Sequence, residues 1–165
     1  MNSKGQTWVF DYIVGFLMFA FLLILSLSLL RSIDAKSDYD LVSREVDFVS
    51  VALVSPGFPD NWNSSSVIFP GLLSDNKINK SKLDLFDTFG YERTKALLRV
   101  TGEYWFYFKD ESGIIEVNGK CVRGFSYGGG CDLPVVTARH SDRAWTERIV
   151  VLDSRIVTLM VVGWR

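Results

Sequence analysis

The chain has 165 residues, of which 22% are charged, and its formal net charge is −1 at pH 7. This balance gives no reason to expect a nucleic-acid partner, because there is no basic excess to neutralise phosphates. The length is sufficient for one domain of ordinary size together with a membrane segment.

A long apolar run lies near the amino terminus. Residues 12–30, YIVGFLMFAFLLILSLSLL, form nineteen positions without a charged side chain. At about 1.5 Å rise per residue, a helix of this length spans roughly 28 Å, close to the hydrocarbon thickness of a bilayer. No second run of this length follows. The sequence therefore predicts one membrane helix, over residues 8–30, in contact with membrane lipid, and a soluble domain from Arg31 on.

Three interpretations of this amino terminus compete. It is a secretory signal peptide cleaved near Ala35, a simple signal anchor, or a prepilin-type leader that is cut before the apolar run. The apolar core is longer than the roughly 7–15 residues usual for a signal peptide. The third interpretation accounts for more of the residues, because it uses the polar segment before the run as well as the run itself.

Lys4, Gly5 and Gln6 directly precede the apolar helix. In this respect the chain resembles archaeal type IV pilin-like proteins with class III signal peptides. The resemblance implies that a membrane prepilin peptidase cuts after Gly5, which removes residues 1–5 as the leader and leaves Gln6 as the first mature residue. It also implies a cytoplasmic amino terminus, a stem helix over residues 6–55 and an extracellular head over residues 56–165.

Asp11 is the one acidic residue near the start of the apolar run. An ionised carboxylate in hydrocarbon costs about 2.5–3.5 kcal/mol at the centre of a helix, and less near its end. The resemblance implies an assembly role, in which Asp11 meets the free α-amine of Gln6 in a neighbouring subunit. Asp11 would be the sixth mature residue, whereas many members of the family carry a glutamate at the fifth. The alternative is that Asp11 lies at the level of the lipid headgroups without a partner.

The chain after the membrane segment continues as a predicted helix to residue 55. Its apolar positions 42, 46, 49 and 53 repeat at helical spacing and mark one buried face. Pro56 and Pro59 end this helix in a loop, and Trp62 is expected to pin that loop to the head. Two short helices are expected over residues 80–89 and 91–100, separated by Gly90, with Ser81 as a possible cap of the first.

From residue 102 the pattern becomes strand-like. The aromatic segment 102–110, a hairpin signal at Asn118-Gly119, and apolar runs on both sides of Asp153-Ser154 predict four or five antiparallel strands. A long amino-terminal helix, small helices and then an antiparallel sheet make the expected fold class α+β, with a pilin-like architecture.

Cys121 and Cys131 are the two cysteines. In a domain outside the membrane they predict one disulfide that closes a short loop, worth about 2–3 kcal/mol in the chain-entropy model. The alternative is two free thiols in a cytoplasmic domain. No metal site and no cofactor are expected, because no helper histidine or carboxylate pattern accompanies the cysteines. Asn63 and Asn79 begin two Asn-Xaa-Ser triplets, which are possible N-glycosylation sites.

Gly124 to Gly128 match the G-x-S-x-G pattern of serine hydrolases, but the serine lies in a cysteine-bounded loop and His140 follows only fourteen residues later. The chain is therefore expected not to be an enzyme. The leading hypothesis is a structural subunit, either major or minor, of an archaeal type IV pilus-like surface filament. Its partners would be sister pilin subunits, the prepilin peptidase and the pilus assembly platform. The alternative is a single-pass, membrane-anchored extracellular binding or adhesion module that does not polymerise.

Overall fold

The computed structural model describes the backbone of residues 4–125, 131 and 143–165, and the side chains of the same residues apart from 4–8 and 30–38. The chain divides into two compact units, Met1–Ser37 and Asp38–Arg165. Helix α1 contributes to both units, so the second unit begins within the helix and contains its last turns. The elements, in chain order, are α1 (Lys4–Leu53), β1 (Leu73–Ser74), β2 (Lys77–Ile78), α2 (Lys80–Thr88), α3 (Tyr91–Leu97), β3 (Glu103–Asp110), β4 (Gly113–Ile115), β5 (Val122–Gly124), β6 (Arg143–Leu152) and β7 (Arg155–Trp164).

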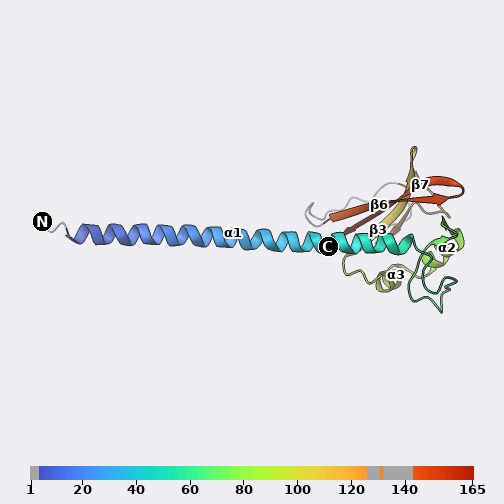
Figure 1. Ribbon diagram of the computed structural model, residues 1–165, viewed down its shortest axis with the longest axis horizontal. Helices are drawn as coiled ribbons and strands as arrows, with labels where there is room; N and C mark the ends of the chain where they lie inside the picture. Colours follow the sequence, from blue (N-terminus) through green and yellow to red (C-terminus); the bar gives the residue numbers. More distant parts are fainter. Residues whose placement is uncertain (1–3, 126–130, 132–142) are drawn as a thin grey trace. The chain divides into compact units, whose positions relative to one another are not determined.

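The predicted α+β class is confirmed. Among the described residues, one antiparallel sheet contains five strands in the order β4-β3-β7-β6, with β5 also paired to β3. Three of these strands, β3, β6 and β7, are labelled in Figure 1. The strands β4 and β5 follow one another along the same edge of β3, since Ile115 pairs with Phe108 and Val122 pairs with Tyr107. The pairing of β6 with β7 extends over all ten residues of each strand. The predicted turn between them is present, with positive φ at Asp153 and Ser154.

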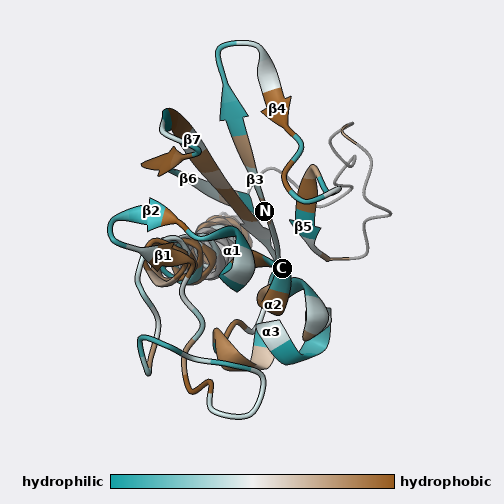
Figure 2. Ribbon diagram, turned by 90° about the vertical axis from the view of Figure 1, so that its right-hand side faces the viewer, coloured by the Kyte–Doolittle hydropathy of each residue, from teal (hydrophilic) through white to brown (hydrophobic). Residues whose placement is uncertain are grey.

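The last turns of α1 pack on one face of this sheet. The predicted apolar face of the helix is buried, with Val42, Val46, Val49 and Leu53 at most 3% exposed. The apolar side chains of β3 and β7 that face the helix belong to the same core, and much of β7 is coloured as hydrophobic in Figure 2. A Cβ on Gly163 would lie 2.5 Å from Val46 Cγ2, so the absence of a side chain there permits the close approach of helix and sheet.

The segment after α1 folds back onto the core as predicted. The indole of Trp62 is buried, and its Nε1 donates a hydrogen bond to Gly71 O at 3.0 Å. The hairpin of β1 and β2, which the sequence did not indicate, follows this loop. Lys82 is buried beside it and donates to Pro56 O and Leu73 O, at 2.7 and 2.8 Å. Burial lowers the pKa of Lys82, partly offset by the charge of Asp60.

The two short helices α2 and α3 are confirmed, but the cap of α2 is not Ser81. Asn79 is the N-cap, because its side chain accepts hydrogen bonds from Ser81 N and Lys82 N. Asparagine is among the best N-cap residues, since a short side chain with a carbonyl oxygen reaches the free N–H groups of the first turn. Both Asn79 and Ser81 can serve this role chemically, and the actual start of the helix at Lys80 decides between them.

Glu103 joins α3 to the sheet and makes stability depend on pH. Burial raises the pKa of Glu103, but hydrogen bonds from Lys95 and Tyr91 and the charge of Lys95 outweigh it, so that the pKa lies below 4.5. A lowered pKa stabilises the fold above the unfolded-state pKa, and this contribution is lost as pH falls through the folded-state pKa.

We therefore expect Glu103→Gln to be less stable than the unchanged chain at pH 7, with a difference in Tm that shrinks as pH falls below about 4.5. Thermal unfolding of both proteins between pH 7 and pH 3 measures this difference. A difference in Tm that stays constant over the whole range would contradict the assignment.

Candidate functional site

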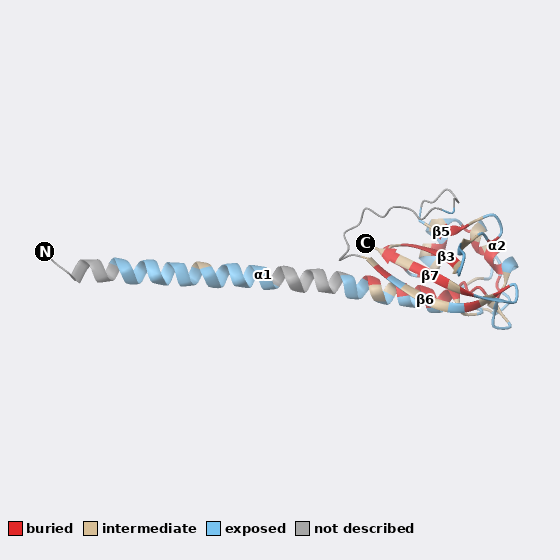
Figure 3. Cartoon of the chain, turned by 90° about the horizontal axis from the view of Figure 1, so that it is seen from above, coloured by how far each residue is buried: buried red, intermediate tan, exposed pale blue. Residues whose placement is uncertain are grey.

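The apolar segment of α1 is the first candidate feature, because no other part of the described chain buries it. In the described part of the chain, one helix is long and apolar enough by length and composition to cross a membrane, at Val9–Leu29 near the amino terminus, and none of it is buried. The large apolar side chains of this segment are exposed, and Figure 3 colours almost all of its residues as exposed. A helix that is apolar on every side needs an apolar environment, either lipid or other apolar helices.

Asp11 is the only charged residue within this segment, and its side chain is exposed. Within the described residues it takes part in no hydrogen bond or ion pair, and Gly5 and Gln6 lie in the first turn of the same helix. The first turn of a helix has N–H groups without intrahelical acceptors, so opening it costs few hydrogen bonds. The predicted cleavage residues and Asp11 are therefore on one continuous helix, with the carboxylate available to a group from outside the chain.

A patch of exposed apolar side chains lies on the second unit, and we call it the Phe48 patch. Phe48 and Val51 belong to α1 but point away from its buried face, and they are 46% and 51% exposed. Phe58 and Ile68, from the following loop, are 61% and 62% exposed. The ring of Phe48 contacts that of Phe69 at 5.7 Å between centroids, and Phe69 forms a backbone bridge with Phe58. The patch therefore joins the helix and the loop in one apolar surface.

The predicted disulfide between Cys121 and Cys131 is present. Cys121 is buried and belongs to a small apolar cluster on the face of the sheet opposite α1, whereas Cys131 is exposed. Glu116 brings a carboxylate within 4.8 Å of both sulfur atoms. Because the two sulfur atoms are bonded to each other, neither offers a thiolate, and the group has a single carboxylate with which to bind a metal.

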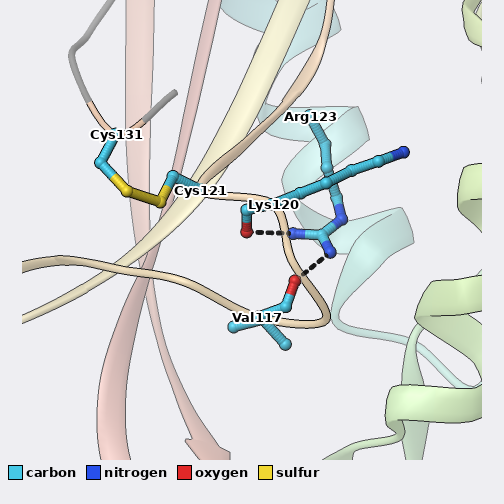
Figure 4. The surroundings of a disulfide bond; sticks show 5 residues. All are labelled: Val117, Lys120, Cys121, Arg123 and Cys131. Carbon is cyan, nitrogen blue, oxygen red and sulfur yellow. Dashed lines mark hydrogen bonds between the residues drawn. A yellow bond between two sulfur atoms is a disulfide. The ribbon is translucent and has the colours of Figure 1, made fainter. Parts of the chain in front are cut away.

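Arg123, two residues after Cys121, is a central residue that the sequence did not indicate. Its side chain is 2% exposed, and Nε donates to both oxygens of Asp87 on α2, at 3.1 and 3.0 Å. Its two terminal nitrogens donate to Lys120 O and Val117 O, which close the turn at Asn118-Gly119 (Figure 4). One guanidinium thus joins α2, the turn and β5.

A cleft of about 450 Å³ lies next to this arginine, between α2, α3 and the turn. Its charged groups are already paired with each other, since Asp87 binds Arg123 and Lys120 Nζ lies 3.5 Å from Asp87. The hydroxyl of Thr94 donates to Tyr91 O and accepts from the hydroxyl of Tyr104. The polar groups of the cleft therefore hold the fold together, and the described residues include no activated nucleophile there.

The G-x-S-x-G match begins at Gly124 on β5, which pairs antiparallel with β3. A Cβ on Gly124 would lie 2.3 Å from Tyr104 O, which explains the glycine by the close approach of two strands. This edge-strand setting differs from the strand-turn-helix of a nucleophile elbow. Ser126 and His140 lie outside the described residues.

The two predicted glycosylation sites differ in their surroundings. Asn63 is exposed in the loop between α1 and β1, whereas Asn79 is half-buried and caps α2. Among the predicted site residues, the structure brings together only the two cysteines, in the disulfide, and the residues at the start of α1, on one helix.

The main candidate features are thus an exposed apolar helical segment with one carboxylate, and an α+β unit that contains one disulfide and an exposed apolar patch. Comparisons of the chain with known protein families, with curated proteins and with solved structures gave no match.

Proposed function

We propose that this chain is a structural subunit of an archaeal type IV pilus-like surface filament. The observation that supports it best is the apolar segment Val9–Leu29 of α1, which is exposed on all sides and carries a single carboxylate at Asp11. A filament of packed apolar helices would bury this surface, and a membrane would hold it before assembly. The segment Lys4-Gly5-Gln6 before it supports processing by a prepilin peptidase.

The proposed mechanism has two stages. The precursor is anchored in membrane lipid through α1, and cleavage after Gly5 creates a charged α-amine on Gln6. At the assembly platform, the apolar helix then exchanges lipid for the helices of sister subunits. In that low-dielectric environment, Asp11 of one subunit pairs with the α-amine of another, because an opposite charge offsets the cost of keeping each group ionised.

The second unit would provide the outer contacts of the filament. The Phe48 patch supports this role, because its apolar side chains are exposed in the single chain and a neighbouring subunit would cover them. The disulfide between Cys121 and Cys131 supports an extracellular head, since disulfides persist in oxidising surroundings.

The test of this proposal is the mature amino terminus, read by intact mass and terminal sequencing of protein from its native membrane. We expect the chain to begin at Gln6. A chain that begins at Met1 would instead support an anchored binding module that does not polymerise, and one that begins near Lys36 would indicate a secreted soluble domain.

Two glycine variants make this test sharper. Gly5→Val should block processing, because a branched side chain would fill the place where the peptidase needs a bare backbone. Gly15→Val is the matched control, since a Cβ at Gly15 would meet nothing within 4 Å beyond its chain neighbours and the backbone of its own helical turns. Equal processing of both variants would contradict cleavage after Gly5.

A further inference from the structure

We propose that Asn63 carries an N-linked glycan and that Asn79, which begins the second Asn-Xaa-Ser triplet, does not. The proposal goes beyond the filament function, because it requires only that the second unit reaches the outer side of a membrane where glycan transfer occurs. It rests on the different hydrogen bonds that the two side-chain amides make in the fold.

The amide of Asn63 is open at its nitrogen. Its Oδ1 accepts hydrogen bonds from Ser65 N at 3.0 Å, Ser65 Oγ at 2.8 Å and Ser66 N at 3.0 Å. Within the described residues, Nδ2 makes no hydrogen bond, and Asn63, Ser64 and Ser65 are all exposed. The nitrogen that would receive a sugar is therefore free in solvent, and the serine hydroxyl of the triplet already lies beside the amide.

The loop that carries Asn63 is held at defined points. The preceding residue, Trp62, is buried and bonded to Gly71 O, and Arg93 on α3 donates to Ser64 O at 2.6 Å. These contacts use the indole and the backbone, so none of them occupies the side chain of Asn63. A bulky, hydrophilic substituent on Nδ2 would extend into solvent without displacing a core residue.

The amide of Asn79 is occupied on both sides. Its Oδ1 caps α2 through Ser81 N and Lys82 N, and its Nδ2 donates to Ser74 Oγ at 3.0 Å. The middle residue of this triplet, Lys80, forms an ion pair with Asp153 at 2.6 Å. A sugar on Nδ2 would separate Asn79 from Ser74 and disturb the junction of α2 with β1.

Glycan transfer would form one bond at Asn63 Nδ2 and break another at the lipid phosphate. Asn63 Nδ2 attacks the anomeric carbon of a glycan linked to a lipid phosphate or diphosphate, and a bond between nitrogen and carbon forms. The bond from that carbon to the phosphate oxygen breaks, and the lipid phosphate leaves with the electron pair. Nδ2 loses one proton to a base of the transferring enzyme, which acts on the accessible amide.

The experiment uses full-length protein isolated from its own cells and mapped by mass spectrometry. Cleavage after Arg44 and Lys77 releases peptide 45–77, which contains Asn63 but not Asn79. In a second digest, cleavage before Asp75 and Asp84 releases peptide 75–83, which contains Asn79 but not Asn63. We expect a glycan mass on peptide 45–77 and the unmodified mass for peptide 75–83.

Two serine variants form a matched pair. Ser65→Ala destroys the triplet and should return peptide 45–77 to the mass without glycan, whereas Ser64→Ala preserves the triplet and should retain the glycan. An unmodified peptide 45–77 in the unchanged protein, a glycan on peptide 75–83, or a glycan that survives Ser65→Ala would each overturn the proposal. The amino terminus is read from the same sample, so an unmodified Asn63 in a chain that begins at Gln6 would refute this inference and leave the filament proposal standing.

Discussion

Replacing Asp11 by alanine is expected to remove the subunit from filaments while leaving the second unit folded. In the assembled state the substitution would leave the α-amine of Gln6 charged and unpaired among apolar helices. An unpaired charge costs about 2.5–3.5 kcal/mol at the centre of a helix and less near its end, so the loss of incorporation is expected to reach at most roughly 100-fold. Immunoblots of sheared filaments against the membrane fraction measure this ratio.

The controls for this experiment separate charge from shape. Asp11→Asn keeps the size of the side chain but not its charge and should behave like the alanine variant, whereas Asp11→Glu keeps the charge and should retain part of the incorporation. The Tm of the second unit should stay unchanged in all three, because Asp11 belongs to the first compact unit, Met1–Ser37, and the second unit has its own core. Full incorporation of Asp11→Ala would show that the carboxylate lies unpaired at the headgroup level.

Replacing Arg123 by alanine is expected to be the most destabilising single change outside the apolar core. Asp87 is 15% exposed and would lose its main partner. The carbonyl groups of Val117 and Lys120 would each lose one of two donors, since each also accepts from the backbone N–H of the other residue. Breaking a buried ion pair by removing one partner costs about 3–5 kcal/mol, because the remaining charge stays desolvated. Unfolding of the full chain in detergent, followed by circular dichroism, measures this loss.

A matched control is the exposed ion pair between Lys80 and Asp153, whose side chains are 46% and 59% exposed. Lys80→Ala should cost less than about 1 kcal/mol, because solvent screens exposed pairs. The Arg123→Lys protein should also be less stable than the unchanged chain. A compact ammonium group, unlike the planar guanidinium, cannot reach the carboxylate and two separate carbonyl groups at once. A loss below about 1 kcal/mol for Arg123→Ala would show that the cleft hydrates Asp87.

Much of the secondary structure was predictable because local chemistry determines it. The aromatic run of β3, the turn residues Asp153-Ser154 and the helical spacing of Val42 and Val46 each carry a period or a backbone preference of their own. The hairpin of β1 and β2 was missed because its two-residue strands are too short to show a period. The pairing of β4 and β5 with β3 could not be predicted either. The Asn118-Gly119 signal indicates a turn, but it does not show that the strands on its two sides both pair with β3.

The candidate site residues also divide into those that the local sequence indicates and those that only the fold reveals. Gly5, Gln6 and Asp11 were proposed as site residues from the order of residues alone, and two cysteines allow a single intramolecular pair. Arg123 gave no local signal, because an arginine in a short polar segment is usually exposed. The different surroundings of Asn63 and Asn79 were equally hidden, since both begin the same triplet and only contacts with Ser74, Ser81 and Lys82 distinguish them.

By itself, the sequence of this protein determined the apolar helix, the place of its one carboxylate, the α+β class and the cysteine pair. These follow from composition, spacing and local backbone preference. Only the tertiary structure decided which polar side chains are buried, which amides are engaged and which apolar surfaces stay open. The physical reason is that burial and hydrogen bonding depend on residues that are distant in the chain, as the bond from Arg123 to Asp87 illustrates.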